Sequence, residues 1–348
     1  MKKSSFIIAD ISRVNFYKGI AIIAVLCIHY LSSMPWGTFT INPHADFYIM
    51  LDQICRLSVP LFLALSGYGL TKKYSTEMTL FEFYTRRLVR LLPNYIFWSI
   101  TLWLLFMQVP LWYSTASQNH LWQIIILGYA DYHLYFIPLI FQLYLLFPLF
   151  LFLIKKYPIA TVIGAYAIQL FCLHIFSQWA GRTDLPFEFN DQTQYALFIP
   201  WVGYFILGMY MATTNFFTTK IKKLGLLILV MTTLILAIRN AQSAVHGGLD
   251  PLYALKFTRY SIVLYASSVI LFALSGIQKL LTLPRPIEKC ITTLGVYSLL
   301  IYLSHTLFLR LYFRERYTGV TAQELLLGSG VLVVGLYISY HIEKKLAH

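Results

Sequence analysis

The sequence predicts an all-α fold, an integral membrane bundle of about ten transmembrane helices with both termini in the cytoplasm (N-in and C-in). Three observations predict it. The chain has 348 residues, of which 58% are hydrophobic and 12% charged, whereas soluble domains carry about 25% charged residues. The apolar residues form runs long enough to cross a bilayer, which takes about 20 residues per helix. Lys and Arg cluster in alternate connecting segments, as the positive-inside rule requires.

Ten apolar runs predict the spans. No small-residue cleavage site follows the opening Lys2 and Lys3, so the first run is expected to remain in the protein as a helix. No linker divides the chain and no soluble domain is expected at either end, so residues 1–348 are predicted to form a single membrane domain. In chain order, the spans cover about 15–33, 47–70, 89–109, 134–154, 158–177, 195–213, 223–240, 257–278, 292–312 and 323–342.

The connecting segments give the orientation. The segments at about 34–46 and 110–133 contain no Lys or Arg, and they alternate with basic segments that are predicted to be cytoplasmic. Three residues break the pattern, because Arg310, Arg314 and Arg316 fall on the predicted outer side. They either mark a functional outer surface or indicate that the ninth span is misplaced. The basic segments carry Lys2, Lys3, Lys72, Lys73, Arg86, Arg87, Lys155, Lys156, Lys220, Lys222, Lys223, Lys279, Arg285, Lys289, Lys344 and Lys345.

Charge and cysteine content exclude other classes of protein. The formal net charge is +13, but the basic residues lie between apolar runs as orientation signals do, which argues against nucleic-acid binding. The four cysteines show neither the spacing of a zinc site nor that of a disulfide framework, and no metal is expected. The predicted location is the inner (plasma) membrane of the cell, as a multi-pass protein.

The first candidate functional residue is His29. Ionisable residues inside a bilayer are costly, so each is a candidate site. His29 follows Lys18 by eleven residues, which places the two side chains within about 20° of one helix face and about 16 Å apart along the axis. Lys18 is therefore expected near the cytoplasmic surface and His29 deep in the membrane. The alternative is a buried histidine satisfied by a neighbour, with Lys18 extended to the interface.

The second candidate is the basic cluster of Arg86, Arg87 and Arg90, just before Pro93 in TRRLVRLLPNYIFW. Within it, Arg87 and Arg90 lie three apart and so share a helix face at the cytoplasmic mouth of the third span. The planar fork of donors on arginine suits phosphate groups. The alternative interpretation is an ordinary positive-inside anchor.

His305 and the pair Asp52 and Arg56 complete the candidates. His305 is predicted about two thirds of the way across the ninth span, at a depth similar to that of His29. The two histidines either share a cavity or are unrelated. Asp52 and Arg56 are four apart in the second span and can pair on one helix face. This pair either supports the site or only fixes helix packing.

Five segments carry a family resemblance. RVNFYKGIAIIAVLCIH contains a basic residue, a ten-residue spacer and a histidine, here Lys18 and His29. VPLFLALSGYGL contains Ser66, and RRLVRLLPNYIFW contains an Arg-x-x-Arg element at Arg87 and Arg90. HLYFIPLIFQLYLLFPLF and GVYSLLIYLSHTLFL follow. In this order, on ten predicted spans, they resemble helices of the acyltransferase 3 family of polytopic membrane acyltransferases.

Two features depart from the family pattern. The family often has an acidic residue three positions before the basic residue of its first helix, where this chain has Asn15. Some members also carry a second, extracytoplasmic hydrolase-like domain that finishes the transfer. This chain ends at His348 and is expected to be the stand-alone form without that domain.

The resemblance implies transfer of an acyl group, commonly acetyl from acetyl-CoA, to a hydroxyl of an extracytoplasmic or lipid-linked glycan. Acyl-CoA is implied as the donor substrate and not as a permanently bound cofactor, with the glycan and membrane lipid as further partners. His29 and His305 are the catalytic candidates, and His29 acts either as general base or as a transient acyl carrier. The residues implied to bind acyl-CoA or to support the site are Lys18, Arg87, Arg90, Asp52, Arg56 and Ser66.

Two other functions remain open on the sequence. A transporter or exporter of a glycan or small solute is the first, because intramembrane charges also suit transport pathways. A membrane module that only binds or senses a ligand is the second. The arginine pair together with a deep histidine favours the enzyme, because an exporter has no need of a cytoplasmic phosphate clamp.

Overall fold

The computed structural model describes residues 2–32, 44–74, 79–108, 121–179, 191–214, 220–275, 283–317 and 330–341. Within these ranges the chain is helical and contains no strand, as the sequence predicts. The helices are α1 (Lys2–Ser32), α2 (Ala45–Cys55), α3 (Ser58–Lys73), α4 (Leu80–Gln108), α5 (Leu121–Ile126), α6 (Phe136–Lys156), α7 (Pro158–Trp179), α8 (Asp191–Ala196), the 3-10 turn η3 (Ile199–Trp201), α9 (Val202–Thr213), α10 (Lys220–His246), α11 (Pro251–Ala254), α12 (Tyr260–Leu274), α13 (Arg285–Val296), α14 (Ser298–Tyr317) and a last helix at Gly330–His341.

The described part of each predicted span is helical over most of its length. Among the described residues, six helical segments are long and apolar enough to cross a membrane, or seven if the pair Arg285–Val296 and Ser298–Leu311 counts as one span. Three further apolar helices are shorter, at Ile199–Thr213, Tyr260–Leu274 and Gly330–His341. The fold is therefore an all-helical one with several membrane-length helices. The number of ten spans and the N-in, C-in orientation stay predictions.

The ninth predicted span is not a straight helix. α13 ends at Val296, the backbone of Tyr297 closes its last turn, and α14 begins at Ser298 with a bend of 83°. α13 packs against α1 through Gly295, and this tertiary contact is not encoded in the run at 292–312. The depth predicted for His305 assumed one helix rising from residue 292, so that depth no longer follows. The exposed charged side chains of α13 are those of Arg285, Glu288 and Lys289.

The helices gather into two compact units, each built from three separate stretches of chain. The first unit comprises Met1–Ser75, Leu151–Ala167 and Trp201–Ser298, and the second comprises Thr76–Phe150, Ile168–Pro200 and Leu299–His348. Both α6 and α7 contribute residues to both units. No single cut in the sequence therefore separates the two, and each unit is described by itself below.

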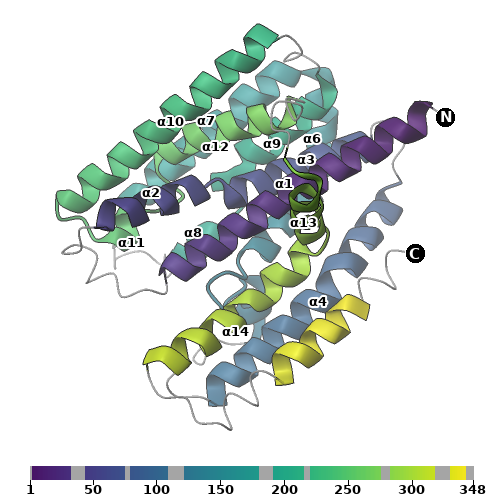
Figure 1. Ribbon diagram of the computed structural model, residues 1–348. Helices are drawn as coiled ribbons and strands as arrows, with labels where there is room; N and C mark the ends of the chain where they lie inside the picture. Colours follow the sequence, from purple (N-terminus) through teal and green to yellow (C-terminus); the bar gives the residue numbers. More distant parts are fainter. Residues whose placement is uncertain are drawn as a thin grey trace. The chain divides into compact units, whose positions relative to one another are not determined.

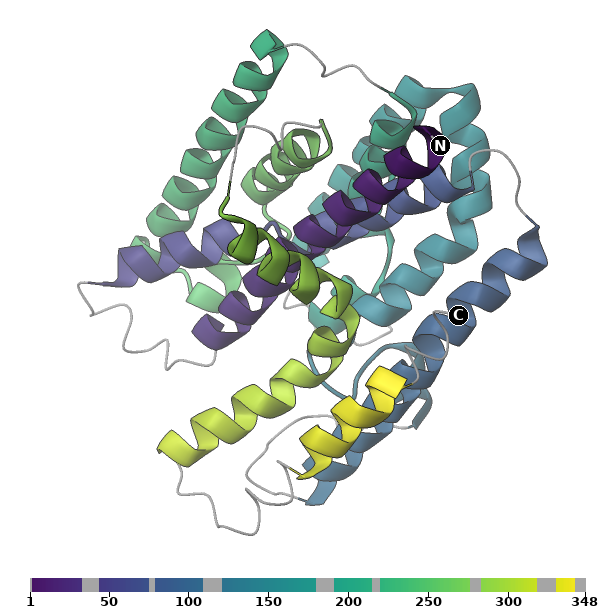
Figure 2. The same ribbon diagram turned by 45° about the vertical axis from the view of Figure 1, so that its right-hand side comes forward.

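In the first unit, α1 crosses α13 at close range (Figure 1, Figure 2). Two glycines permit the approach. A Cβ atom on Gly19 would overlap the backbone carbonyl of Ile291, and a Cβ atom on Gly295 would overlap that of Asn15. Small residues at such crossings let two helix backbones approach within van der Waals contact. The crossing fixes the part of α1 that carries Lys18.

A second close approach joins α3 to α9. A Cβ atom on Gly67 would overlap the backbone of Phe205, and a Cβ atom on Gly208 would overlap that of Ala64. The same unit also places α10 beside α12 and α2 (Figure 1). Helices of the first unit therefore pack with their backbones in contact at these glycines. A larger residue at any of them would force the two helices apart.

Gly208→Ala is expected to lower the free energy of unfolding by about 1–3 kcal/mol, because forcing extra volume into a tight contact costs about that much. The matched control is Gly69→Ala on α3, where nothing lies within 4 Å of the added Cβ atom. That change should be neutral or stabilising by about 0.5–1 kcal/mol, the preference of a helix for Ala over Gly. Thermal unfolding in detergent measures both, and equal Tm values would contradict the close approach.

The second unit is organised around α4, which runs beside the last helix in both views (Figure 1, Figure 2). The indole Nε1 of Trp98 donates a hydrogen bond of 2.9 Å to the hydroxyl of Ser339. One turn earlier, the hydroxyl of Tyr95 donates to the backbone carbonyl of Ile125 at the end of α5 over 2.8 Å. These contacts connect α4 to the last helix and to α5, which is followed by a turn that carries polar residues.

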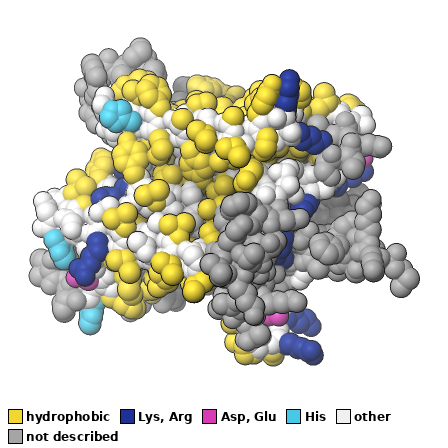
Figure 3. Space-filling model, turned by 90° about the horizontal axis from the view of Figure 1, so that it is seen from above, with side chains coloured by type: hydrophobic (Ala, Val, Ile, Leu, Met, Phe, Trp, Pro, Cys, Tyr) yellow, Lys and Arg dark blue, Asp and Glu magenta, His cyan; other side chains and the backbone are white. Residues whose placement is uncertain are grey.

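Helices α7 and α10 expose apolar side chains. Figure 3 shows hydrophobic side chains over much of the described part of the face in view. Soluble monomers rarely expose so much apolar surface, so these helices are suited to contact lipid. Exposed residues of this kind on α7 and α10 include Ile159, Ile163, Ile168, Phe171, Ile228, Met231 and Ile235.

Candidate functional site

Helix α1 positions Lys18 and His29 in the first unit. The helix is unbroken from Lys2 to Ser32, so the eleven-residue separation keeps both side chains near one face, as the sequence predicts. Both residues are half-buried. His29 lies in the last turn, where Ser32 Oγ donates a hydrogen bond of 3.1 Å to the His29 carbonyl. Because α1 is continuous, His29 lies about 16 Å along the helix axis from Lys18.

Asp52 and Arg56 form the ion pair that their spacing predicts. Arg56 donates to both carboxylate oxygens of Asp52, from Nη2 over 2.7 Å and from Nε over 2.9 Å. Gln53 Nε2 adds a third hydrogen bond of 2.9 Å to Asp52. The guanidinium carbon lies 4.6 Å from the ring centroid of Phe257. Asp52 is fully buried. The pair itself is present, and its supporting role in the site stays a prediction.

The remaining predicted residues lie apart on two helices. Ser66 is half-buried on α3, directly before Gly67 and its close contact with α9. Arg87 and Arg90 lie on α4, which continues without a break past Pro93, and Arg87 is half-buried while Arg90 is exposed. Their i, i+3 spacing on a helix is thus present, and their binding role stays a prediction.

A turn between α5 and α6 carries a buried charge cluster of the second unit. Gly128 adopts φ +75°, and a Cβ atom there would come within 2.7 Å of the carbonyl group of Leu134. Only glycine takes this conformation at low cost, so Gly128 closes the turn. The backbone N–H of Leu134 then donates to the carbonyl of Asp131 over 3.0 Å. This turn aims the side chains of Asp131 and His133 inward.

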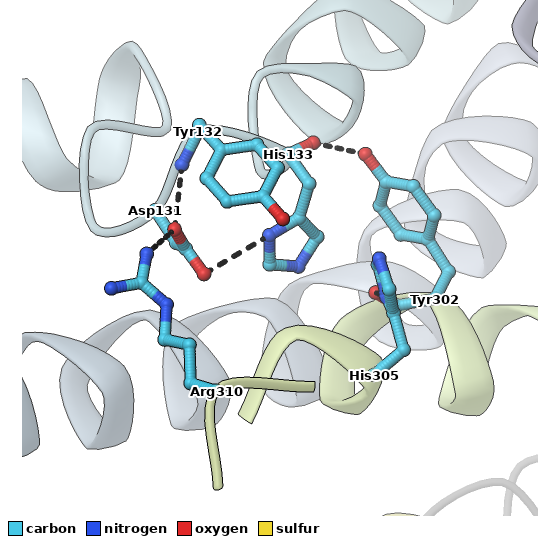
Figure 4. Close-up of polar contacts among 6 residues, drawn as sticks. All are labelled: Asp131, Tyr132, His133, Tyr302, His305 and Arg310. Carbon is cyan, nitrogen blue, oxygen red and sulfur yellow. Dashed lines mark hydrogen bonds and ion pairs between the residues drawn. The ribbon is translucent and has the colours of Figure 1, made fainter. Parts of the chain in front are cut away.

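Asp131 pairs with Arg310 from α14 (Figure 4). Arg310 Nη2 donates to Asp131 Oδ1 over 2.6 Å, and the backbone N–H of Tyr132 donates to the same oxygen over 2.9 Å. The Asp131 side chain is 1% exposed and that of Arg310 22% exposed. Arg310 broke the positive-inside pattern, and the structure gives it a partner. The side chains of Arg314 and Arg316 lie outside the described residues.

Two histidines adjoin this ion pair (Figure 4). His133 Nδ1 lies 3.3 Å from Asp131 Oδ2. The rings of His133 and His305 meet edge to face, with centroids 4.9 Å apart. His305 Nδ1 lies 2.7 Å from the backbone carbonyl of Tyr302, whose hydroxyl in turn donates to the backbone carbonyl of His133. Both histidines are buried.

The surroundings of Asp131 keep it charged. Burial by itself would raise the pKa of this carboxyl group, but Arg310, His133 and Thr306 outweigh that effect and hold the pKa well below its usual range. Opposite charge and hydrogen bonds to the charged form both act in this direction. The carboxylate is therefore a permanent anion at physiological pH.

The predicted residues divide between the two units. The first unit contains Lys18, His29, Asp52, Arg56 and Ser66. The second unit contains Arg87, Arg90 and His305. The cavity predicted to be shared by His29 and His305 would join residues of different units, and it stays a prediction.

Sequence reasoning missed Asp131 and His133. Asp131 lies in the segment at 110–133, whose sequence signal is its lack of Lys and Arg. His133 opens the segment HLYFIPLIFQLYLLFPLF, which points to the family and not to a role for its histidine. A signal did exist, because an arginine on the predicted outer side requires an acidic partner on that side. Arg310 is such an arginine, and Asp131 lies in a segment that is also predicted to be on the outer side. Other carboxylates are predicted on that side too, including Asp46 and Asp184, so charge alone does not select Asp131.

Comparison with known proteins gives one match. A family model described as an acyltransferase domain, that of the acyltransferase 3 family, matches residues 11–343. No curated protein and no solved structure matches the chain.

Proposed function

Because the chain belongs to the acyltransferase 3 family, we propose that it is a membrane O-acyltransferase that uses cytoplasmic acyl-CoA to acylate a hydroxyl of a cell-surface or lipid-linked glycan. Acetyl is the proposed acyl group. The family match confirms the resemblance of the five segments and makes the chain a membrane acyltransferase in general terms. The observation that carries the finer proposal is the unbroken helix α1, which holds Lys18 and His29 eleven residues apart on one face.

The dimensions of coenzyme A support this arrangement. Its phosphates lie at one end and its thioester at the end of a long flexible arm. Arg87 and Arg90, with Lys18, would hold the phosphates at the cytoplasmic surface. The thioester would then reach His29, about 16 Å along α1 from Lys18. The inner (plasma) membrane is the proposed location, since the acceptor lies on the outer side.

His29 is the proposed catalytic residue. It acts either as the general base on the acceptor hydroxyl or as a carrier that forms a transient acyl-histidine. His305 is proposed to assist by orienting the reacting groups or by stabilising the developing oxyanion. The Asp52–Arg56 pair, which lies in the same unit as His29, is proposed to support the site by orienting His29 or by stabilising the developing oxyanion.

Consumption of acetyl-CoA by the purified protein tests the proposal. Release of the free coenzyme A thiol, followed with a thiol reagent, should require the wild-type chain and should increase when cell-envelope glycan is added. A transporter or a sensing module would bind ligand without releasing thiol. Absence of thiol release with and without glycan would contradict the enzyme and favour the transporter.

Arg87→Ala and Arg90→Ala are each expected to weaken acyl-CoA binding by about 1.5–3 kcal/mol, the range for hydrogen bonds to charged groups. Lysine should restore only part of the loss, because it lacks the planar fork. Isothermal titration with acetyl-CoA measures the affinity. The matched control is Arg86→Ala on the same helix, since Arg86 is exposed and pairs with Glu82. Normal binding by the folded double variant would leave Arg87 and Arg90 as topology anchors.

A further inference from the structure

Two cations of the first unit that the mechanism above does not use meet at one aromatic ring. Arg13 lies on α1 before the first predicted span, and Lys72 lies on α3 after the second. The guanidinium carbon of Arg13 lies 5.5 Å from the centroid of the Tyr68 ring, and Lys72 Nζ lies 5.7 Å from the same centroid. Both distances fall within the range of about 6 Å in which an aromatic ring attracts a cation.

Tyr68 holds the guanidinium in place. Its hydroxyl accepts a hydrogen bond from Arg13 Nη2, and Tyr68 itself is only 3% exposed. The residue before it, Gly67, packs against the backbone of Phe205 on α9. The ring therefore belongs to the closely packed part of this unit. An arginine that is already held against such a ring loses little further freedom when a ligand binds, which favours affinity.

The placement of the two cations indicates more than an orientation signal. Like charges beside one ring repel each other, and the positive-inside rule requires neither an aromatic ring nor a second cation nearby. Lys73, the neighbour of Lys72, contacts a different ring, that of Tyr74, at 5.5 Å. An anion in contact with both cations would offset the repulsion. A phosphate group suits them, because guanidinium offers it a planar fork of donors and ammonium a point charge.

A ligand can reach these cations from outside the helix packing, since Lys72 is exposed and Arg13 is half-buried. One residue precedes the first predicted span and the other follows the second, so the predicted topology puts both on the cytoplasmic side. Phosphate groups come to that surface from two sources. One is coenzyme A in the cytoplasm, and the other is the headgroups of anionic phospholipids.

We propose that Arg13 and Lys72 bind a phosphate group and that Tyr68 is the residue that positions Arg13 for it. The phosphate is that of acyl-CoA or that of an anionic phospholipid, and the same contacts serve both. Its assignment to acyl-CoA rests on the function proposed above, whereas its assignment to a lipid does not. All three residues belong to the first unit.

Binding measurements on the purified full chain test the site, with one probe for each source. Acetyl-CoA is titrated by calorimetry, and short-chain phosphatidylglycerol is titrated by the rise in Tm, with phosphatidylcholine as the neutral reference. Arg13→Gln should weaken binding of at least one probe about 10- to 150-fold, as expected for hydrogen bonds to a charged group. Lys72→Gln should weaken binding of the same probe about 2- to 5-fold, because its ammonium group is exposed.

Three further variants separate positioning from charge. Tyr68→Phe keeps the ring and removes the hydroxyl, so it should weaken binding of the same probe although every cation remains. Arg13→Lys should restore part of the binding that Arg13→Gln loses. The matched control is Lys73→Gln, which removes the same charge one residue away from Lys72 and should bind both probes as the wild type does.

The results decide both the site and its ligand. A loss confined to acetyl-CoA assigns the phosphate to the donor, a loss confined to phosphatidylglycerol assigns it to lipid, and a loss of both shows that the two share the site. Wild-type binding of both probes by Arg13→Gln, or equal effects of Lys72→Gln and Lys73→Gln, would overturn the proposal. If Arg13→Gln does not fold, the two lysine variants still decide. A wild type that binds acetyl-CoA but releases no thiol would contradict the proposed enzyme and not this site.

Discussion

His29→Ala is expected to abolish acyl transfer and to leave acyl-CoA binding nearly unchanged. His29 lies in the last turn of α1, eleven residues beyond Lys18, so its loss removes the reacting group without touching the proposed phosphate contacts. Loss of a general base typically costs about 100- to 10,000-fold in rate, and loss of an acyl carrier removes the covalent route altogether. Turnover of acetyl-CoA by the purified variant, together with its binding affinity, measures both quantities.

The matched control for this variant is His174→Ala. His174 is an exposed histidine on α7 that contacts Gln178 over 3.0 Å, and its removal should leave transfer intact. Substantial transfer by the purified His29→Ala protein would remove His29 from the mechanism and make His305 the next candidate. An acyl group trapped on His29 after rapid quench would decide for the carrier over the base.

Arg310→Met is expected to lower the free energy of unfolding by about 3–5 kcal/mol, the cost of leaving one partner of a buried ion pair uncompensated. Asp131 is 2% exposed and accepts from Arg310 over 2.6 Å, so without the guanidinium its charge would remain in a low-dielectric site. Methionine keeps the length and apolar stem of the side chain, which confines the change to the charge. Thermal unfolding in detergent measures the effect.

Two further variants show whether charge is the cause. Arg86→Met removes an ion pair with Glu82 in which both side chains are about half exposed, at 53% and 54%, and such pairs contribute about 0–1 kcal/mol. Adding Asp131→Asn to Arg310→Met should restore part of the lost stability, because no uncompensated carboxylate is left. If Arg310→Met and Arg86→Met unfold at the same temperature as the wild type, the buried pair does not stabilise the fold.

The sequence predicts the helices well because each apolar run must satisfy its own backbone hydrogen bonds. That requirement is local, and the runs at 134–154 and 158–177 coincide closely with α6 and α7. The break at Tyr297 could not be found in this way. The run at 292–312 is apolar throughout its centre, and the bend depends on the packing of α13 against α1, which is a tertiary contact.

The candidate site shows the same division between local and distant contacts. Asp52 and Arg56 are one helical turn apart, so their spacing alone predicts the pair that the structure contains. Asp131 and Arg310 are separated by 179 residues, and no periodicity connects them. The meeting of His133 with His305 depends on the turn at Gly128 and on the start of α14 after the bend. Neither feature is encoded in residue spacing.

The separation of Asp131 from Arg310 sets an order of events during synthesis. At about 5–20 residues per second, a ribosome takes about 10–35 s to add the 179 residues between them. Throughout this interval the Asp131 carboxylate has no guanidinium partner, so it must remain in contact with water or take up a proton. The second unit therefore reaches its final packing only after most of the chain has been translated. A chain that ends before Arg310 would therefore lack the partner that this buried carboxylate has in the folded protein.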